Sequence, residues 1–262
     1  MWKVMNTEDG EYTKPELQIG DKTVVIDSLN GVFYNKEYPL NGIGINEFSR
    51  TDEGYTVYID KFWGTLSYDM DTEDNIELRI PHLVHADPMG ISKLYGISPT
   101  DLPERDDQLN PYNQAYERRT IQGELPTTVI IDREYYIDVR LYELRNVKNF
   151  HDRLNLNDTM EIDDGRFIGF LNLKTRKFEW PDVDQQCPAG CAVIVLPNET
   201  RLDPVGWARR RGSNDDEYLW ISPVQYNQRT EAFQFKNGKF EKLNFSPEGH
   251  RRQRRKHKGF GM

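Results

Sequence analysis

The feature that most constrains the fold of this chain is a phrase that occurs twice. The sequence IPHLVHADPMGISKLYG spans residues 80–96, and LPNETRLDPVGWARRRG spans residues 196–212. Both have Pro in the second position, an Asp-Pro pair beginning six residues later, a Gly two positions after the Pro of that pair, and a closing Gly. A phrase that recurs along a chain with fixed spacing indicates a repeated structural unit.

Two alignments support the repeat. Residues 18–54 align without gaps with residues 129–165, and eight of these 37 positions are identical. Residues 81–96 align with residues 197–212, where five of 16 positions are identical. The offset grows from 111 to 116 because the second copy is five residues longer ahead of its phrase. Matching stretches in the same order predict a tandem duplication, whereas the alternative is two unrelated Asp-Pro turns.

Each copy is predicted to consist mainly of strands. Short runs rich in β-branched and aromatic residues alternate with turn residues such as Asn30-Gly31. The runs are TVVID, YTVYID, WGTLSY and IELRIPHL in the first copy, and TTVII, YYIDVRL, RFIGFLNL, KFEW and AVIVL in the second. Connections this short favour antiparallel pairing, because parallel strands need a long crossover. We therefore expect a β-rich α+β fold made of two tandem copies of a small antiparallel-sheet domain.

The predicted organisation is an N-terminal extension over residues 1–17, the first copy over 18–97, a linker over 98–126, the second copy over 127–248 and a basic tail over 249–262. The linker contains four prolines and is expected to be an ordered strap or a flexible connection, with one helical turn at NQAYERR. The second copy is expected to end in a hairpin at AFQFKNGKFEKLNF, because its Asn-Gly pair is the one that type I′ turns prefer.

The repeated phrase is predicted to join a strand to a helix. An Asp before a Pro is a favourable helix start, because the Asp side chain accepts from free backbone N–H groups and Pro needs no donor there. These residues are Asp87 and Pro88 in the first copy and Asp203 and Pro204 in the second. Gly96 and Gly212 are expected to end the helices after about two turns.

One further Gly lies inside each predicted helix, at Gly90 and Gly206. Gly in a helix interior costs roughly 1 kcal/mol relative to Ala. This cost predicts that the helix backbone packs closely against the sheet. The alternative role, a ligand-binding loop, is disfavoured because an Asp at the helix start would repel an anion such as phosphate.

Charge is distributed unevenly along the chain. The formal net charge is −9, but the residues after Glu248 carry six cations and no acid, which leaves 28 basic and 43 acidic residues and a charge of −15 for the rest. Such a tail is typical of an arm that binds a polyanion, although it could also dock on the acidic body or on another subunit. A second basic cluster ends the second predicted helix, where cations also stabilise the helix dipole. The predicted polyanion-binding residues are Arg251, Arg252, Arg254, Arg255, Lys256, Lys258, Arg209, Arg210 and Arg211.

The sequence offers no motif for a metal, another cofactor or a catalytic centre. His82 and His85 are three residues apart, and on a strand such residues face opposite sides, which argues against a shared metal. Cys187 and Cys191 have no second pair with which to complete a zinc site and are expected to be ordinary loop thiols. Nucleophile-elbow, HExxH and Walker motifs are lacking.

The leading hypothesis is a non-enzymatic interaction or structural protein, for example a phage or mobile-element component. Its acidic body would contact a protein partner or copies of itself, and its basic tail would contact nucleic acid or another polyanion. Two alternatives stay open: a hydrolase that uses carboxylates between the two copies, and a protein-only adaptor or immunity-type binder. The sequence lacks an apolar run near the roughly 20 residues that span a bilayer and lacks a signal-peptide core, so we expect a cytoplasmic location, or a virion for a phage component.

Overall fold

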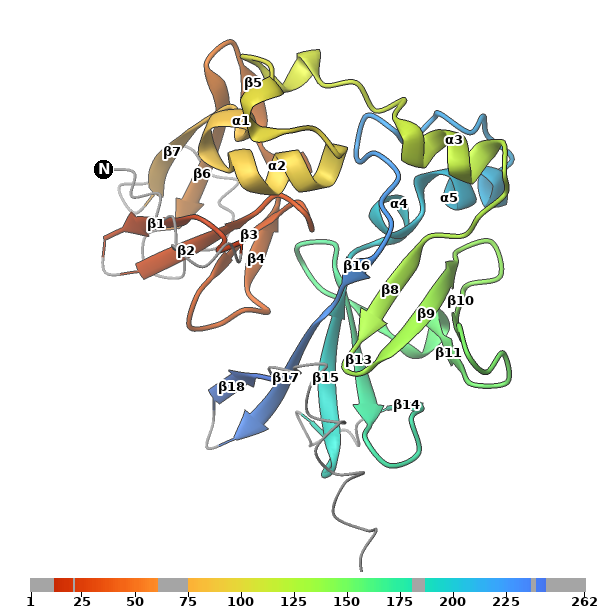
Figure 1. The fold of residues 1–262 in the computed structure, drawn as a ribbon. Helices are drawn as coiled ribbons and strands as arrows, with labels where there is room; N and C mark the ends of the chain where they lie inside the picture. Colours follow the sequence, from red (N-terminus) through yellow and green to blue (C-terminus); the bar gives the residue numbers. More distant parts are fainter. Residues whose placement is uncertain (1–11, 21, 61–74, 181–186, 237–238, 244–262) are drawn as a thin grey trace, which may run out of the picture.

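The computed structural model describes residues 12–20, 22–60, 75–180, 187–236 and 239–243 of the chain. Within these residues the fold is β-rich, with short strands arranged in four sheets and a few short helices. Figure 1 shows strands β1 to β7 with helices α1 and α2 on one side of the molecule and the later strands on the other, with the linker crossing between them. The expected β-rich fold with antiparallel sheets is confirmed.

The first half of the chain folds into two sheets followed by two helices (Figure 1). Its strands are β1 (Glu16–Ile19), β2 (Lys22–Asp27), β3 (Val32–Asn35), β4 (Gly42–Gly44), β5 (Ser49–Thr51), β6 (Gly54–Asp60) and β7 (Asn75–Pro81). A 3-10 turn (Ile45–Glu47) separates β4 from β5, and helices α1 (Leu83–Ala86) and α2 (Pro88–Tyr95) follow β7. The strand order is β1-β2-β3-β4 in one sheet and β5-β6-β7 in the other, and every neighbouring pair is antiparallel.

The second half has the same order of elements and a C-terminal addition. Its strands are β8 (Thr127–Ile130), β9 (Arg133–Asp138), β10 (Glu143–Asn146), β11 (Arg153–Asn155), β12 (Met160–Glu161), β13 (Phe167–Asn172), β14 (Phe178–Glu179), β15 (Cys191–Leu196), β16 (Gln228–Arg229), β17 (Glu231–Lys236) and β18 (Lys239–Lys242). A 3-10 turn (Leu156–Asp158) separates β11 from β12, and α4 (Glu199–Leu202) and α5 (Pro204–Arg211) follow β15. The sheets are β11-β10-β9-β8-β16 and β12-β13-β15-β17-β18, with β14 on β13; only the short β16 pairs in parallel, with β8.

The linker contains regular structure. Two 3-10 turns (Pro99–Asp101 and Asp106–Gln108) precede α3 (Gln114–Thr120), which lies where the sequence predicts a helical turn. The side chain of Asn113 accepts from the backbone N–H of Tyr116 at 3.0 Å and caps this helix.

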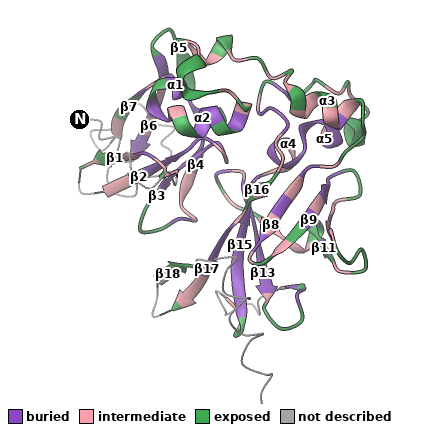
Figure 2. Cartoon of the chain, viewed as in Figure 1, coloured by how far each residue is buried: buried purple, intermediate pink, exposed green. Residues whose placement is uncertain are grey.

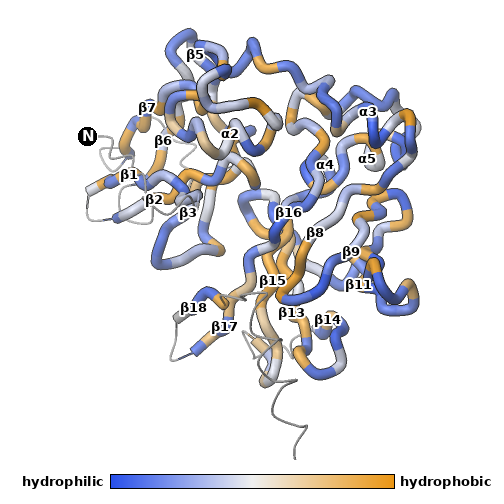
Figure 3. Tube along the Cα trace, viewed as in Figure 1, coloured by the Kyte–Doolittle hydropathy of each residue, from blue (hydrophilic) through white to orange (hydrophobic). Residues whose placement is uncertain are grey.

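The cores follow from the pattern of apolar residues. In β6, Tyr55, Val57 and Ile59 are buried and alternate with half-buried neighbours, which is the period of two expected for one covered face. All six residues of β15 are buried, because apolar clusters cover both faces of its sheet. Figure 2 shows this strand in the buried class, and Figure 3 shows it among the most hydrophobic segments.

Several predictions about particular elements are confirmed, and one is wrong. The C-terminal hairpin forms from β17 and β18 with Lys236 opposite Lys239, and β17 joins the sheet of the second half through β15. The turn pair at 237–238 and the predicted strand at WGTLSY lie outside the described residues. The phrase was expected to join a strand directly to one helix, but a four-residue helix, α1 or α4, intervenes before the Asp in each half.

Arginines of the second half fill the contact between the halves. Arg166 is fully buried, binds Asp164 through its guanidinium and donates to the carbonyl oxygen of Pro39 in the first half at 2.7 Å. Arg201 of α4 lies against Gly31, and burial lowers the pKa of its guanidinium to about 10, so it stays charged at neutral pH. These contacts fix the two halves relative to one another through charged groups that are costly to leave unpaired.

We predict that Gly31→Ala destabilises the protein more than Gly20→Ala. Both glycines have positive φ, +66° and +59°, so each substitution carries backbone strain of about 1–2 kcal/mol. A Cβ at Gly31 would also lie 1.9 Å from Cζ of Arg201, whereas Gly20 has no atom within 4 Å. Denaturant unfolding should therefore show an additional loss of about 1–3 kcal/mol for Gly31→Ala. Equal losses for the two variants would contradict the role of Arg201 in joining the halves.

Candidate functional site

The predicted helix joints are present in both halves. Oδ1 of Asp87 accepts from the backbone N–H of Gly90 at 2.9 Å, and Oδ1 of Asp203 accepts from that of Gly206 at the same distance. Pro88 and Pro204 begin the helices, and Gly96 and Gly212 end them in left-handed conformation at φ of 68° and 74°. These residues therefore act as helix caps.

The second carboxylate oxygen of each cap binds a side chain from the segment that precedes the first strand of its half. The Tyr12 hydroxyl donates to Oδ2 of Asp87 at 2.7 Å. Nη2 of Arg119, on α3, donates to Oδ2 of Asp203 at 2.9 Å. Burial raises the pKa of Asp87, whose partner is a neutral hydroxyl. Neither donor has a sequence signal, because both lie more than 70 residues from the carboxylate they bind.

The two internal glycines lie against the carboxylates that cap their own helices. A Cβ at Gly90 would lie 2.0 Å from Oδ2 of Asp87, and a Cβ at Gly206 would lie 2.1 Å from Oδ2 of Asp203. The glycines therefore make room for the capping carboxylate.

The predicted polyanion-binding residues divide into two groups. Arg251, Arg252, Arg254, Arg255, Lys256 and Lys258 lie outside the described residues. Arg209, Arg210 and Arg211 are exposed at the C-terminal end of α5, and each has an intramolecular contact. Arg209 pairs with Asp215 at 2.6 Å, Arg210 donates to the carbonyl oxygen of Arg140, and Arg211 lies over the ring of Trp207.

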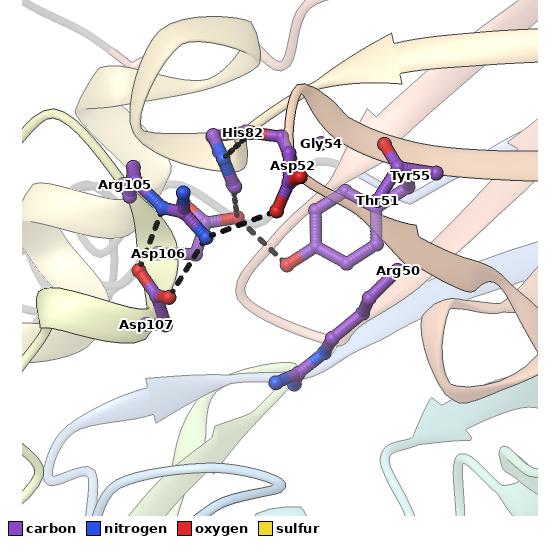
Figure 4. Close-up of a pocket in the computed structure, with 9 residues that line it drawn as sticks. All are labelled: Arg50, Thr51, Asp52, Gly54, Tyr55, His82, Arg105, Asp106 and Asp107. Carbon is purple, nitrogen blue, oxygen red and sulfur yellow. Dashed lines mark hydrogen bonds and ion pairs between the residues drawn. The ribbon is translucent and has the colours of Figure 1, made fainter.

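A polar pocket of about 410 Å³ lies between β5, β6 and the linker (Figure 4). Its nine lining residues are Arg50, Thr51, Asp52, Gly54, Tyr55, His82, Arg105, Asp106 and Asp107. Sequence reasoning singled out His82 alone among these, because the others are ordinary turn and strand residues brought together by the fold.

Asp106 is the central group of this pocket. Its carboxylate accepts from the backbone N–H groups of Leu83 and Val84 at 2.7 and 2.9 Å, and from the Tyr55 hydroxyl at 2.7 Å. Burial and the neighbouring carboxylate both raise the pKa of Tyr55. Asp106 therefore caps α1 from the linker and ties the linker to the first half.

The HLVH sequence begins a helix and does not lie on a strand, so the expected geometry of its two histidines is wrong. His82 is the N-cap residue of α1, and His85 is exposed. Nε2 of His82 lies 3.2 Å from the carbonyl oxygen of Asp52, and Nδ1 has no hydrogen-bond partner in the described part of the chain. The described residues contain no cluster of three or more His, Cys, Asp or Glu arranged for a metal.

Part of the charged rim of the pocket is internally paired. Arg105 binds Asp107 through two hydrogen bonds of 3.1 and 3.0 Å. The lining includes two hydroxyls, that of Tyr55, which donates to Asp106, and that of Thr51, and it includes no Ser, Cys or Lys. Cys187 and Cys191, which lie elsewhere, are free thiols whose pKa values are raised by burial, and this makes them poor nucleophiles.

A second charged cluster joins the two halves. Nζ of Lys14 lies 2.6 Å from Asp27 and 2.9 Å from Glu231. Burial alone would lower the pKa of Lys14, but attraction to the two carboxylates outweighs burial and raises it. Burial alone would likewise raise the pKa values of Asp27 and Glu231, and Lys14 instead lowers them. All three groups stay ionised at neutral pH.

Every helix that the structure describes is too short or too polar to cross a membrane. Comparison with known proteins identifies no relative, because the chain matches no family model and neither a curated protein nor a solved structure resembles it significantly. Its function is therefore inferred from its own residues.

We predict that Gly90→Ala destabilises the protein by about 1–3 kcal/mol, because its Cβ would collide with the capping carboxylate of Asp87. Helix propensity alone predicts the opposite sign, a gain of about 1 kcal/mol. Denaturant unfolding distinguishes the two. The added Cβ would also lie 2.6 Å from the hydroxyl oxygen of Tyr12, so the control is the same substitution in a background that carries both Asp87→Ala and Tyr12→Phe. There the collision is gone, and the added loss should largely disappear. Additive losses would contradict this explanation of the glycine.

We predict that Lys14→Met destabilises the protein by about 3–5 kcal/mol at neutral pH, because it leaves Asp27 buried without a counter-charge. The folded-state pKa values of Asp27 and Glu231 are lowered, so their stabilisation is present above about pH 4 and is lost as the pH falls. The folded-state pKa of Lys14 is raised, so the stabilisation that Lys14 contributes is lost as the pH rises above about 10.4.

Stability measured from pH 7 to pH 2 tests this account. The difference between wild type and Lys14→Met should shrink on acidification. The control is Lys36→Met, which removes an exposed pair with Glu16 and should change stability by at most about 1 kcal/mol. A deficit of Lys14→Met that is independent of pH would contradict the charge interaction.

Proposed function

We propose that this protein is a non-catalytic binding protein whose acidic body makes protein contacts and whose basic tail binds nucleic acid or another polyanion. The observation that carries this proposal is the separation of charge along the chain. Six cations and no acid follow Glu248, and the remainder has a formal charge of −15. The body would repel a polyanion, so the tail is the part suited to bind one.

The proposal includes a duplicated body, with copies over residues 18–97 and 127–248 joined by a linker over 98–126. Support comes from equivalent hydrogen bonds in the two halves at the offset of 111 residues. These pairs are Ile45 N to Gly31 O and Leu156 N to Tyr142 O, both 2.9 Å, and Asn30 N to Asp27 Oδ1 and Leu141 N to Asp138 Oδ1, both 3.1 Å. Two unrelated halves have no reason to share such bonds together with the order of their strands and helices.

The charged groups within the body support a binding role over a hydrolytic one. A hydrolase that uses two carboxylates needs one acid with a raised pKa facing a cleft. The acids at the contact between the halves, Asp27 and Glu231, have lowered pKa values and share Lys14. Asp87 has a raised pKa, but its two oxygens are occupied by Gly90 and Tyr12. These acids hold the fold together.

The tail's composition sets the expected strength and salt dependence of binding. Each Lys or Arg that neutralises a phosphate releases a condensed counterion, so log K falls with log salt by about 0.9 for each contact on double-stranded DNA. Six contacts would give a slope near −5. The clustered Arg209, Arg210 and Arg211 could add to this slope only by leaving their intramolecular partners.

We predict that full-length protein binds labelled single- or double-stranded DNA or RNA and that a truncated 1–248 chain does not. Fluorescence anisotropy across a salt series gives both the affinity and the slope. A full-length variant with Gln at residues 251, 252, 254, 255, 256 and 258 should lose binding to the same extent, because the interaction depends on charge.

A matched variant with Gln at residues 209–211 keeps the tail and serves as the control. It should retain most of the affinity, since these arginines are engaged within the body. Binding that survives removal of the tail, or binding without salt dependence, would overturn the proposed role of the tail.

A further inference from the structure

The two halves differ in how the edges of their sheets are covered. In the second half, β15 lies between β13 and β17 and is hydrogen-bonded on both edges. The strand in the same place in the first half is β7, which also runs directly into a pair of helices. Among the described residues β7 pairs only with β6. An edge strand presents a row of unpaired N–H and C=O groups that can bind another chain.

The offset of 116 residues identifies the part of β7 that lacks a second strand neighbour among the described residues. Residues 193–195 of β15 pair with β17, and they correspond to residues 77–79 of β7. The segment that pairs with β17 reads Val-Ile-Val and is buried, whereas the corresponding segment of β7 reads Glu-Leu-Arg. The Arg79 side chain is 74% exposed and that of Glu77 is 35% exposed. The first half therefore has an acid and a base at the positions where the second half has apolar residues that pair with β17.

Residues 76–80 of β7 read Ile-Glu-Leu-Arg-Ile, which is complementary to itself in an antiparallel pair. With Leu78 opposite Leu78 of a second copy, Glu77 faces Arg79 and Ile76 faces Ile80. Glu77 and Arg79 lie on one face of the strand, and Ile76, Leu78 and Ile80 lie on the other, so the charged pairs share one face of the joined sheet and the apolar pairs share the opposite face. Opposite charges and apolar residues placed directly across neighbouring strands stabilise a sheet.

We propose that β7 binds β7 of a second copy of this chain, antiparallel and around a twofold axis at Leu78. The pairing joins the three-stranded sheets of two molecules into one six-stranded sheet, β5-β6-β7 followed by the same strands in reverse. It also gives the first half the strand neighbour that β17 gives the second half.

A second copy fits this edge better than a strongly charged partner strand does. Glu77 and Arg79 cancel in charge and already lie 2.9 Å apart on one face. A purely basic or purely acidic strand would place a like charge opposite one of them, which is destabilising. An antiparallel strand with the same Glu-Leu-Arg sequence places Arg opposite Glu77 and Glu opposite Arg79. The β7 strand of a second molecule is such a strand.

Charged residues on an edge strand often hinder association between sheets. Here their alternating signs make them specific to one register. A shift of the pairing by two residues places Glu77 opposite Glu77 or Arg79 opposite Arg79, so only the arrangement centred on Leu78 matches both charges.

This inference rests on the part of the proposed function that assigns protein contacts to the body. It makes no use of the tail. Self-association and polyanion binding are therefore measured separately, and loss of tail binding in the truncated chain would leave the pairing of β7 unaffected.

Sedimentation equilibrium of the nuclease-treated full-length protein tests the proposal through a charge exchange. The four proteins are wild type, Arg79→Glu, Glu77→Arg and the double variant that carries both changes. Each single variant places like charges opposite one another twice in the dimer, so the dissociation constant should rise at least about tenfold. The double variant restores two opposite-charge pairs and should return the dissociation constant to near that of wild type.

Both side chains are solvent-exposed, so circular dichroism should be unchanged in all four proteins. Thermal unfolding should also be unchanged when it is measured at a concentration low enough for every protein to be monomeric, because dimer formation itself stabilises the folded state. A wild-type protein that stays monomeric would overturn the proposal, whether the edge of β7 is empty or is covered by another part of the same chain. A dimer whose stability ignores the single substitutions, or whose double variant fails to recover, would overturn it as well, because such a dimer forms elsewhere.

Discussion

The structure depends on one interaction, which is made by a buried aspartate in each half of the chain. This aspartate caps a helix and also holds the segment that precedes the first strand of its half. The carboxylate of Asp87 or Asp203 folds over the first turn of its helix and also binds a side chain that precedes the first strand of the half. One acid therefore joins the segment before the first strand of each half to the helix pair of that half. A buried carboxylate is tolerated only where hydrogen bonds satisfy it, so the capped turn, its proline and the glycine three residues after the aspartate are required together.

The two closures differ in their electrostatics. Asp203 faces the Arg119 guanidinium in a buried ion pair, whereas Asp87 faces the neutral Tyr12 hydroxyl and has a raised pKa. A similar difference separates the sheets of the two halves. The second half covers both faces of β15 with apolar residues and takes up β17, and the first half leaves β7 with charged residues on its edge. In our proposal the first half therefore contacts another molecule through β7, whereas the corresponding strand of the second half is already paired on both edges.

The sequence predicted those features of the fold that depend on residues close together in the chain. The Asp-Pro cap, the closing glycine, the linker helix and the final hairpin all depend on neighbours within a few residues, and all are present. Helix α1 was missed, because its four residues are held by Asp106 from 20 or more positions away. The donors Tyr12 and Arg119 and the lining of the polar pocket were missed for the same reason. Strands of three residues such as β4 and β11 carry no periodic signal of their own. The tail was singled out from charge alone.

The most direct test of this account is native-state hydrogen exchange of the backbone amides of Gly90 and Gly206. Both donate to a buried carboxylate that closes a half of the chain. They should therefore exchange as slowly as core amides such as those of Val57 in β6 and Ile194 in β15, through global unfolding. Fast exchange of either glycine amide, with the core strands still protected, would show that its helix opens independently and would contradict the closing role of that aspartate.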